Sequence, residues 1–351
     1  MATQKVTSNS FQRVAMGLED ADAYGTPVQP NLLLEEHDNS LDNVHTTVTQ
    51  RVGAGKTQRV HVARGFEYPE GTLPLLITPE KCGPLFYALL GAVATTGSSA
   101  PYTHVITPSL DGSRPSMTLE HMYSNLYRVM SGMTIVSADF SAANGDMLRC
   151  SLTVSGKQTQ NYDSTQCDAA VAWDAIDVLT SPMMEIERDS SVVTDTYNPS
   201  WTITNDLVFA EPQQKGVYAP RTGAGAGGVG ATIRFFLHSE ASDPEGLLRD
   251  FLGDTGSSYP VGPAAVGTLP RIPIKFTFES SEDVGTSSTA YSLVFEFPYA
   301  YISGYQRGSF NNMQGWDVEM TADVDESSGV LCSITLVNSV DDITTAATAI
   351  A

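Results

Sequence analysis

Two glycine-rich segments carry residue types that could hold a phosphate group. Gly53-Ala-Gly55-Lys56-Thr57 resembles the end of a Walker loop, and Gly223-Ala-Gly225-Ala-Gly227-Gly228 matches GxGxxG. The Walker pattern also requires a glycine five positions before Gly55, where this chain has Gln50. Both segments are followed by alternating, strand-like residues, whereas a phosphate cradle requires a helix N-terminus. We therefore interpret the first as a hairpin tip and the second, within Thr222–Gly230, as a mobile loop or hairpin tip.

The remaining chemically active residue types form no recognised site. The six histidines lack HExxH spacing, and only His45 and His61, which flank the first hairpin, could face each other around a metal ion. The four cysteines contain no CxxC pair, and Cys150 lies in an apolar alternation typical of a core strand in a reducing cytoplasm. No GxSxG nucleophile elbow is present. The sequence thus predicts no enzyme activity, no cofactor and no metal site.

Length and composition limit the class of fold to which these segments belong. The chain has 351 residues, of which 41% are apolar and 17% charged, enough for one large or two ordinary folded domains. Its 29 glycines and 19 prolines favour many short strands and turns. The net charge of −21 disfavours nucleic-acid binding. No apolar run is long enough to span a membrane, and no secretory signal is evident at the start.

An internal repeat is visible in four segments that recur in the same order. Thr72–Glu80 resembles Thr232–Glu240 at an offset of 160, and Met147–Ser155 resembles Gly315–Asp323 at about 168. Between these matches lie two more, which pair Phe86–Ala92 with Leu248–Asp254 and Met117–Glu120 with Phe276–Glu279. Each half is thus predicted to contain a strand, a short helix and several further strands.

Local signals place these elements. The first helix is predicted to begin at Thr78-Pro79 and to end before Gly91, and its counterpart to run from Ser242-Asp243-Pro244 to Gly253. Strands with one apolar and one polar face are predicted over Met133–Ala142, Leu148–Ser155 and Trp316–Asp323. Asn144-Gly145 is a hairpin signal between the first two.

The repeat and the composition suggest five parts. We expect an arm at residues 1–30, a first module at 31–160, an acidic connector at 161–200, a second module at 201–340 and a tail at 341–351. The arm and the tail are predicted to become ordered only when a partner binds them. Acidic groups outnumber basic ones by 16 to 11 in residues 1–171 and by 24 to 8 in residues 172–351, so the second half carries most of the negative charge.

Several segments of the first half resemble the tail tube proteins of tailed phages. The opening Gly17-Leu-Glu-Asp-Ala-Asp-Ala-Tyr24-Gly25-Thr26-Pro27 is similar to their acidic segment leading into Tyr-Gly-Thr-Pro. Further similar segments are Gly83–Gly91, Pro115–Glu120, Tyr127-Arg128 and Gly132–Gly156. The likeness covers residues 15–156, and it extends to the second half only through the repeat.

The resemblance implies a mainly β protein built of two tandem tail-tube-like β-sandwich or barrel modules, each with one short α-helix. Such modules form an inner β-barrel on oligomerisation, which also removes unpaired strand edges. Implied with it are polymerisation into stacked rings, DNA passing through without tight binding, contacts with the tape measure and tail terminator proteins, no membrane, and a place in the virion tail after assembly in the host cytoplasm. Two fused modules would make a ring of three chains with pseudo-sixfold shape.

Specific residues follow from that reading. Asp139, Asp317, Glu319 and Asp323 lie on the polar faces of predicted strands and are candidates to face the lumen. Gly53, Lys56, Gly223, Gly225 and Gly228 lie in the two glycine-rich segments and are candidates for contacts between rings. The alternative is a two-domain β-sandwich adhesin or carbohydrate-binding protein of the virion surface. Its expected cluster of exposed aromatic residues is not apparent, because Trp173, Trp201 and Trp316 are scattered.

Overall fold

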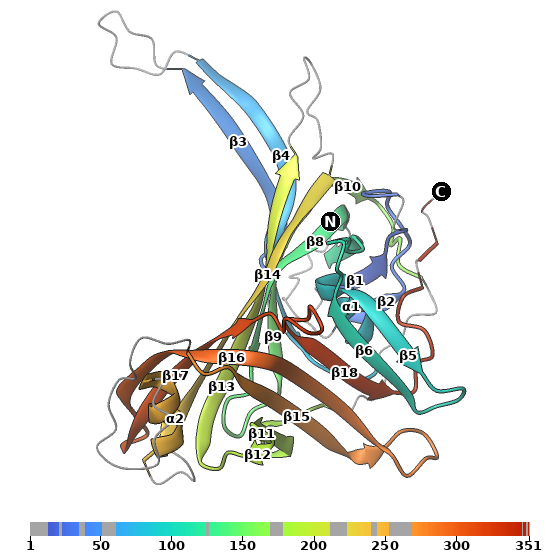
Figure 1. The fold of residues 1–351 in the computed structure, drawn as a ribbon. Helices are drawn as coiled ribbons and strands as arrows, with labels where there is room; N and C mark the ends of the chain where they lie inside the picture. The colour runs from blue at the N-terminus through green and yellow to red at the C-terminus, as the bar shows by residue number, and fades with distance from the viewer. Residues whose placement is uncertain are drawn as a thin grey trace, which may run out of the picture.

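The computed structural model describes most of the chain as antiparallel strands, with two short α-helices among the described residues (Figure 1). The described residues are 13–20, 23–34, 39–50, 61–123, 126–168, 178–210, 223–239, 244–252, 269–345, 347, 348 and 350. The expectation of a mainly β fold with one short helix in each half is confirmed.

The elements have the following bounds. The strands are β1 (Arg13–Leu18), β2 (Leu32–Leu34), β3 (Asp42–Gln50), β4 (His61–Leu76), β5 (Gly91–Thr96), β6 (Tyr102–Pro108), β7 (Met117–Tyr123), β8 (Leu126–Ser141), β9 (Arg149–Ser155), β10 (Gln158–Tyr162), β11 (Met184–Arg188), β12 (Ser191–Val192), β13 (Thr196–Ala210), β14 (Gly223–His238), β15 (Ile272–Asp283), β16 (Ala290–Phe310), β17 (Met313–Asp323) and β18 (Ser333–Asn338). The helices are α1 (Gly83–Leu90) and α2 (Pro244–Leu252), and Ser181–Met183 forms a 3-10 turn.

The strands of the two halves pair in the same order. In the first half the order is β3-β4-β9-β8-β7, with β1 and β2 beside β7. In the second half it is β13-β14-β17-β16-β15, with β11 and β12 beside β15. Thr72 of β4 lies opposite Thr153 of β9, and Thr232 of β14 lies opposite Thr321 of β17. The offsets of 160 and 168 read from the sequence therefore agree with both registers.

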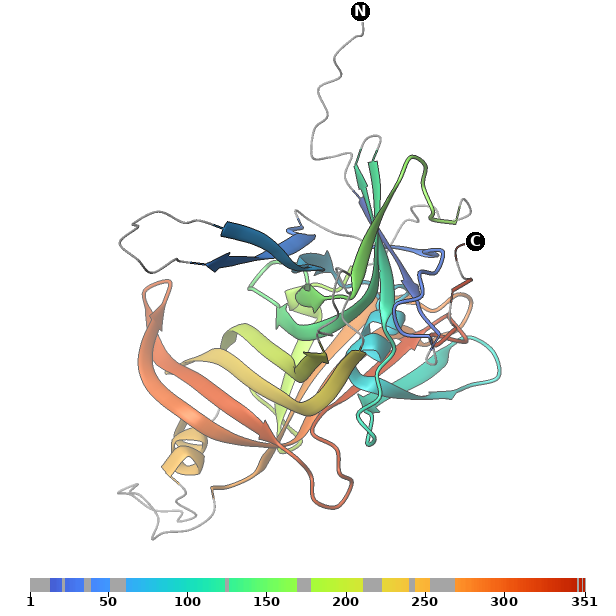
Figure 2. The same cartoon turned by 90° about the horizontal axis from the view of Figure 1, so that it is seen from above.

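Two further strand pairs join the halves into one open sheet system. β8 pairs with β13, and β18 pairs with β6. The strand order β3-β4-β9-β8-β13-β14-β17-β16 consequently runs from one half into the other without a break. Seen from above, β14, β16 and β17 are strongly curved (Figure 2).

One apolar core lies under this sheet and includes side chains of both halves. Phe140 of β8 stacks on Trp201 of β13 with ring centroids 5.5 Å apart, and Trp201 stacks on Phe276 of β15 at 4.5 Å. Phe86 of α1 meets Phe295 of β16 edge-on at 5.8 Å. All of these rings are buried, and Trp201 is only 1% exposed. Their packing therefore buries a large apolar area where the two halves meet.

The first helix begins later than the sequence suggested. The backbone N–H groups of Lys81 and Cys82 donate to the carbonyl oxygen of Thr78, so Thr78–Cys82 forms a separate turn and the helix starts at Gly83. Pro84 occupies the first helical turn, where its missing N–H costs nothing. The predicted end at Gly91 is confirmed: its φ of 95° is left-handed, and a Cβ there would meet the Ser113 carbonyl oxygen at 2.2 Å.

The second helix, α2, starts at Pro244, in agreement with the predicted start. Its predicted neighbours Ser242, Asp243 and Gly253 lie outside the described residues. The hairpin turn at Asn144-Gly145 is also confirmed, with Gly145 at a φ of 80° and the Asp146 N–H donating to the Ala143 carbonyl oxygen.

The expected terminal arms are partly wrong. Residues 13–18 form strand β1 between β2 and β7, and its residues Val14–Leu18 are all buried, because its apolar side chains fit into the core. Ile343 of the tail is 1% exposed, and the Ala347 N–H donates to the Leu18 carbonyl oxygen at 2.9 Å. The described part of the tail thus packs along the start of the chain.

The expected acidic connector also contains regular structure. β11, β12 and the start of β13 lie within residues 161–200, where Ile186 of β11 is buried in the core and Lys275 of β15 pairs with Glu187 at 2.9 Å. Residues 169–177 lie outside the described part.

Candidate functional site

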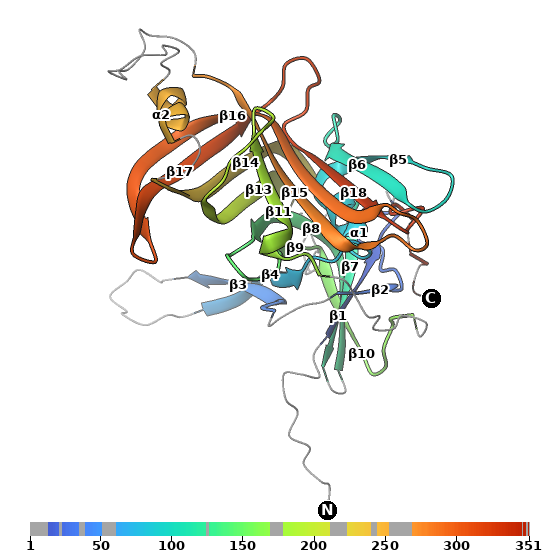
Figure 3. The same cartoon turned by 90° about the horizontal axis from the view of Figure 1, so that it is seen from below.

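The most extensive feature with functional potential is one exposed, polar sheet face, which we call the polar face. It is the side of β9-β8-β13-β14-β17 that lies opposite the core and both helices (Figure 3). In an antiparallel sheet with one solvated face, alternate residues of each strand point to water, and directly opposed residues share a face. One such row crosses all five strands through Ser151, Asp139, Thr202, Thr232 and Thr321.

The junction of the two halves carries a side-chain hydrogen bond on this face. The Thr202 hydroxyl donates to Oδ1 of Asp139 at 2.6 Å, and the Asp139 side chain is exposed. Further along the face, Thr321 donates to the hydroxyl of Ser303 at 3.2 Å. This part of the surface therefore presents small hydroxyl groups beside the Asp139 carboxylate.

All four acidic residues expected to face a lumen lie on this one face. Asp317, Glu319 and Asp323 alternate along β17 with the buried Val318 and Met320, and Asp139 lies in the row that crosses to Thr321. The structure therefore brings together on one surface residues that are far apart in the sequence.

Arginines that the sequence analysis did not single out offset part of this charge. Arg234 of β14 lies opposite Glu319 and contacts it at 3.2 Å. Arg271 contacts Asp323 at 2.9 Å and Glu326 at 3.0 Å, and these carboxylates raise the pKa of the Arg271 guanidinium. The register of β14 against β17 determines the first pair, and the sequence alone does not show which strands are neighbours.

A shallow hollow of about 360 Å³ opens at one end of the polar face. Its lining includes Arg234, Asp317 and Glu319 with Gly304 and Gln306 of β16. At Gly308 of β16, an added Cβ would come within 2.3 Å of an Asp317 carboxylate oxygen, so this strand approaches the carboxylate closely. The hollow is open and mixed in polarity, and no group in it has the geometry of a nucleophile beside a base.

The glycine-rich residues predicted to make contacts between rings do not lie on the polar-face row described above. Of the two interpretations of Thr222–Gly230, a mobile loop or a hairpin tip, the loop is wrong for residues 223–230, because Gly223, Gly225 and Gly228 belong to strand β14 of the β13–β14 hairpin. Gly225 lies opposite Val208 of β13 and Gly223 opposite Ala210, whereas Gly228 falls in a register shift of this strand pair. Gly53 and Lys56 lie outside the described residues, in the stretch of sequence between β3 and β4. The described parts of β3 and β4 project from the body of the molecule (Figure 1).

The residues considered for metal binding are not brought together. In the β3–β4 register His45 lies opposite Glu67 and His61 opposite Gln50, so the two histidines do not face each other. Within the described part of the chain, no three His, Cys, Asp or Glu side chains are grouped as metal ligands. Burial raises the pKa of Cys332 to about 12 and that of Cys167 to about 11, so both are thiols at neutral pH. Among the described helices, none has the length and apolar character needed to cross a membrane.

Comparison with known proteins finds one protein family whose model matches this chain. The family model described as phage tail tube protein matches residues 12–207, which is more than half of the chain and extends from β1 to β13. No curated protein gives a significant match.

Proposed function

This chain belongs to the phage tail tube protein family, and on that premise we propose that it is the major subunit of a tail tube, polymerising into stacked rings around a bore that conducts DNA. The observation that carries the proposal is the polar face, which continues across β8 and β13 from one half of the chain to the other. A ring built from this face would have a hydrated, weakly interacting inner wall.

We propose further that the chain is a fusion of two tube modules, formed by internal duplication. The support is the shared strand order of the two halves and the matched registers of Thr72 with Thr153 and of Thr232 with Thr321. Three chains would then supply the six modules of a pseudo-sixfold ring, and pairing of their free strand edges would close an inner β-barrel.

In this arrangement the polar face lines the bore. Asp139, Asp317, Glu319 and Asp323 then face the lumen, where a negative wall does not retain a passing polyanion. Arg234 partly neutralises Glu319, and Arg271 partly neutralises Asp323, so the negative electrostatic potential of the proposed bore wall is moderate.

The contacts between stacked rings are proposed to involve the ends of two long hairpins. The β3–β4 hairpin leads to Gly53 and Lys56, and the β13–β14 hairpin includes Gly223, Gly225 and Gly228 near its end. The partners of the assembled tube are further copies of the chain, the tape measure and tail terminator proteins, and viral DNA. It forms in the host cytoplasm and remains in the virion tail.

The adhesin alternative gains no support from the described tryptophans. Trp201 is buried, and Trp316 stacks on Tyr305 at 5.9 Å beside α2, so neither offers a platform for a sugar. Trp173 lies outside the described residues.

Electron microscopy of the purified chain tests the proposal. Rings or tubes of fixed diameter with three chains per ring are expected. A protein that stays monomeric under all salt conditions would refute the tube assignment, and a ring of six chains would refute the pseudo-sixfold arrangement while leaving the tube intact.

A further inference from the structure

The joint between β8 and β13 inside the chain has a defined register. Ser137 lies opposite Thr204, Ala138 opposite Ile203, and Asp139 opposite Thr202. Ala138 and Ile203 are fully buried in the core, whereas the other residues point to the polar face. This joint connects a late strand of the first half to the first long strand of the second half.

Each side of the joint has a counterpart elsewhere in the chain. Thr153 of β9 and Thr321 of β17 are equivalent positions of the repeat, at the offset of 168. Ser137 of β8 lies opposite Thr153, and Tyr301 of β16 lies opposite Thr321. Tyr301 is therefore the counterpart of Ser137. The next residues, Ala138 and Ile302, are both buried.

The start of β3 corresponds to β13. Ser40-Leu41-Asp42-Asn43 repeats as Thr202-Ile203-Thr204-Asn205, at an offset of 162. The Ser40 N–H donates to the Thr72 carbonyl oxygen, and Thr202 lies opposite Thr232 in the second half. Leu41 is 2% exposed and Ile203 is fully buried, so the two segments also agree in which side faces the core.

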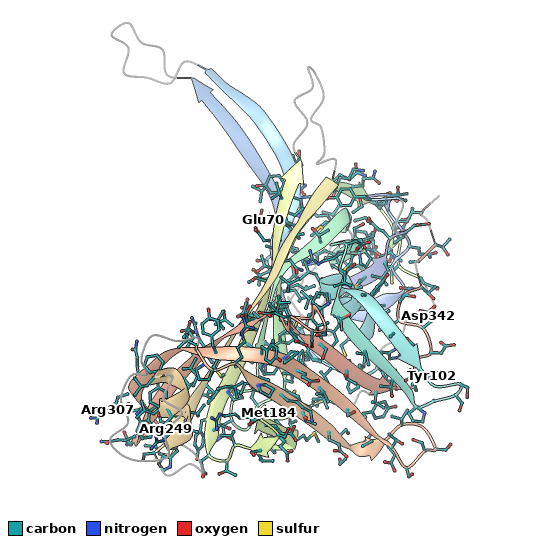
Figure 4. The ribbon with its side chains drawn as sticks, viewed as in Figure 1. Glu70, Tyr102, Met184, Arg249, Arg307 and Asp342 are labelled. Atoms are coloured by element: carbon teal, nitrogen blue, oxygen red, sulfur yellow. The ribbon has the colours of Figure 1, made fainter. Side chains whose placement is uncertain are left out.

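These two counterparts are the ends of the continuous strand order. Among the described strands, β3 is paired with β4 alone, and the part of β16 from Tyr301 to Gly304 is paired with β17 alone. Side chains at the start of β3 also contact Arg128 of β8 and Thr159 of β10. Figure 4 shows how far apart the ends lie, with Glu70 beside the β3 end and Arg307 on the far part of β16. A sheet with two unlike open edges can bind a second copy head to tail, and such a contact forms a ring when the rotation closes.

We propose that the joint between neighbouring chains of the ring repeats the internal β8·β13 joint, with β16 of one copy pairing antiparallel to residues 40–42, at the entry to β3, in the next. The inferred register places Tyr301 opposite Asp42, Ile302 opposite Leu41 and Gly304 opposite Ser40 of the second copy. The proposal rests on ring formation by this chain, and it adds which edges meet and in what register.

The joint between chains has a different composition from the internal one. The stacked Phe140 and Trp201 of the internal joint correspond to Tyr305 and Asn39, so that aromatic stack is absent from the joint between chains. The latter therefore relies on backbone pairing and on the packing of Leu41 and Ile302.

Directed disulfide formation between two chains tests the register. Chains carrying Asp42→Cys and chains carrying Tyr301→Cys, both with Cys167→Ser, are mixed, assembled and mildly oxidised; Cys167 is the one cysteine of the four that is not buried. Directly opposed residues on paired strands have Cα atoms about 4.5–5.5 Å apart, within the range of a disulfide. A covalent dimer is expected from the mixture and from neither chain alone.

The matched control replaces Tyr301→Cys by Gln306→Cys, which is exposed and lies further along the same strand. Loss of the Asp42 ion pair with Arg128 is common to both mixtures. Equal crosslinking of both mixtures, or crosslinking of Tyr301→Cys chains with each other, would overturn the proposed register.

A measurement on the unmodified protein makes the test independent of variant folding. On assembly, amide hydrogen exchange at residues 39–42 and 301–304 should slow roughly tenfold or more, while the exposed loop at residues 326–329 should not change. Rings that form without this protection would refute the inferred joint and leave the tube assignment intact. A chain that forms no rings would refute both.

Discussion

The side-chain amide of Asn205 donates to the carbonyl oxygen of Leu89 at 3.0 Å and to that of Ile135 at 2.9 Å. A strand of the second half thereby binds the last turn of the helix in the first half. Asn205 is 3% exposed, so neither carbonyl can readily exchange this donor for water.

Replacing this amide should loosen the contact between the halves. Asn205→Leu keeps the side-chain size but removes both donors, and we expect a loss of about 1–3 kcal/mol in the free energy of unfolding. Urea unfolding of the isolated chain measures it. The control Asp206→Asn, at the exposed next position, should change stability by less than about 0.5 kcal/mol. Equal stability of the two variants would show that the amide does not hold the helix.

The carboxylate of Glu19 should be equally difficult to replace. It is 2% exposed and accepts hydrogen bonds from the Ser116 and Thr118 hydroxyls and from the N–H groups of Gly25 and Gly132. Glu19→Gln points an NH₂ group at donors, and we expect a loss of about 1–3 kcal/mol. Thermal unfolding is the measurement, with the exposed neighbour variant Asp20→Asn as the control. An unchanged midpoint for Glu19→Gln would contradict this account.

The stability of the chain should fall between pH 6.5 and pH 4 because of His121. Burial lowers the pKa of His121 to about 4, helped by the nearby Arg128 and opposed by Asp42. Below pH 6.5 the unfolded chain therefore binds a proton that the folded chain excludes, so stability is complete above about pH 6.5 and is lost towards pH 4. The loss is of the order of a few kcal/mol.

His121→Gln should remove this part of the pH dependence. Glu120, next to it, acts in the opposite direction, because burial raises its pKa and protonation there favours the folded state. The difference between the parent and the variant isolates the histidine, measured as urea midpoints at several pH values. Parallel pH profiles would show that His121 has the same pKa in the folded and the unfolded chain.

Charge reversal on the polar face tests its place in the bore. Asp317→Lys, Glu319→Lys and Asp323→Lys together should leave the fold intact, because the exposed ion pairs that they break contribute only about 0.2–1 kcal/mol each. Virions with this tube should eject DNA roughly tenfold more slowly at low salt, and the defect should shrink as salt is raised.

The control for that experiment carries Asp317→Asn, Glu319→Gln and Asp323→Asn. It loses the same contacts with Arg234 and Arg271 but adds no positive charge. Ejection rates that are the same for the lysine and neutral variants would place the polar face away from the DNA.

The sequence predicted local features more successfully than contacts between segments. The alternation of Trp316–Asp323 and the positive φ of Gly91 follow from period-two patterning and from glycine's lack of a Cβ, and both are confirmed. The start of α1 was misplaced because Thr78-Pro79 also suits a turn. The pairing of β8 with β13 could not be read from periodicity, since strands far apart in sequence meet there.

Some missed features did have a signal. Val14, Met16 and Leu18 alternate as a buried strand does, but their place near the N-terminus suggested an arm. The similarity between Ser40–Asn43 and Thr202–Asn205 is too short to be detected in the sequence alone. The strand register shows that the two segments occupy equivalent positions in the two halves. The pairing of Arg234 with Glu319 likewise depends on strand neighbours that no single stretch of sequence specifies.

The aromatic stack of Phe140 on Trp201, placed where the two halves meet, has a kinetic and mechanical consequence. In a ring of three such chains, every second seam is already closed by covalent continuity and by this stack before any subunits collide. Such a ring forms at the cost of the translational and rotational freedom of two bodies, whereas six separate modules would lose that of five, so the critical concentration for nucleation falls. The difference in strength between the seams within a chain and the seams between chains also determines how such a tube would break. Under bending or shear it should split along three lengthwise seams, shedding whole chains and never half of one.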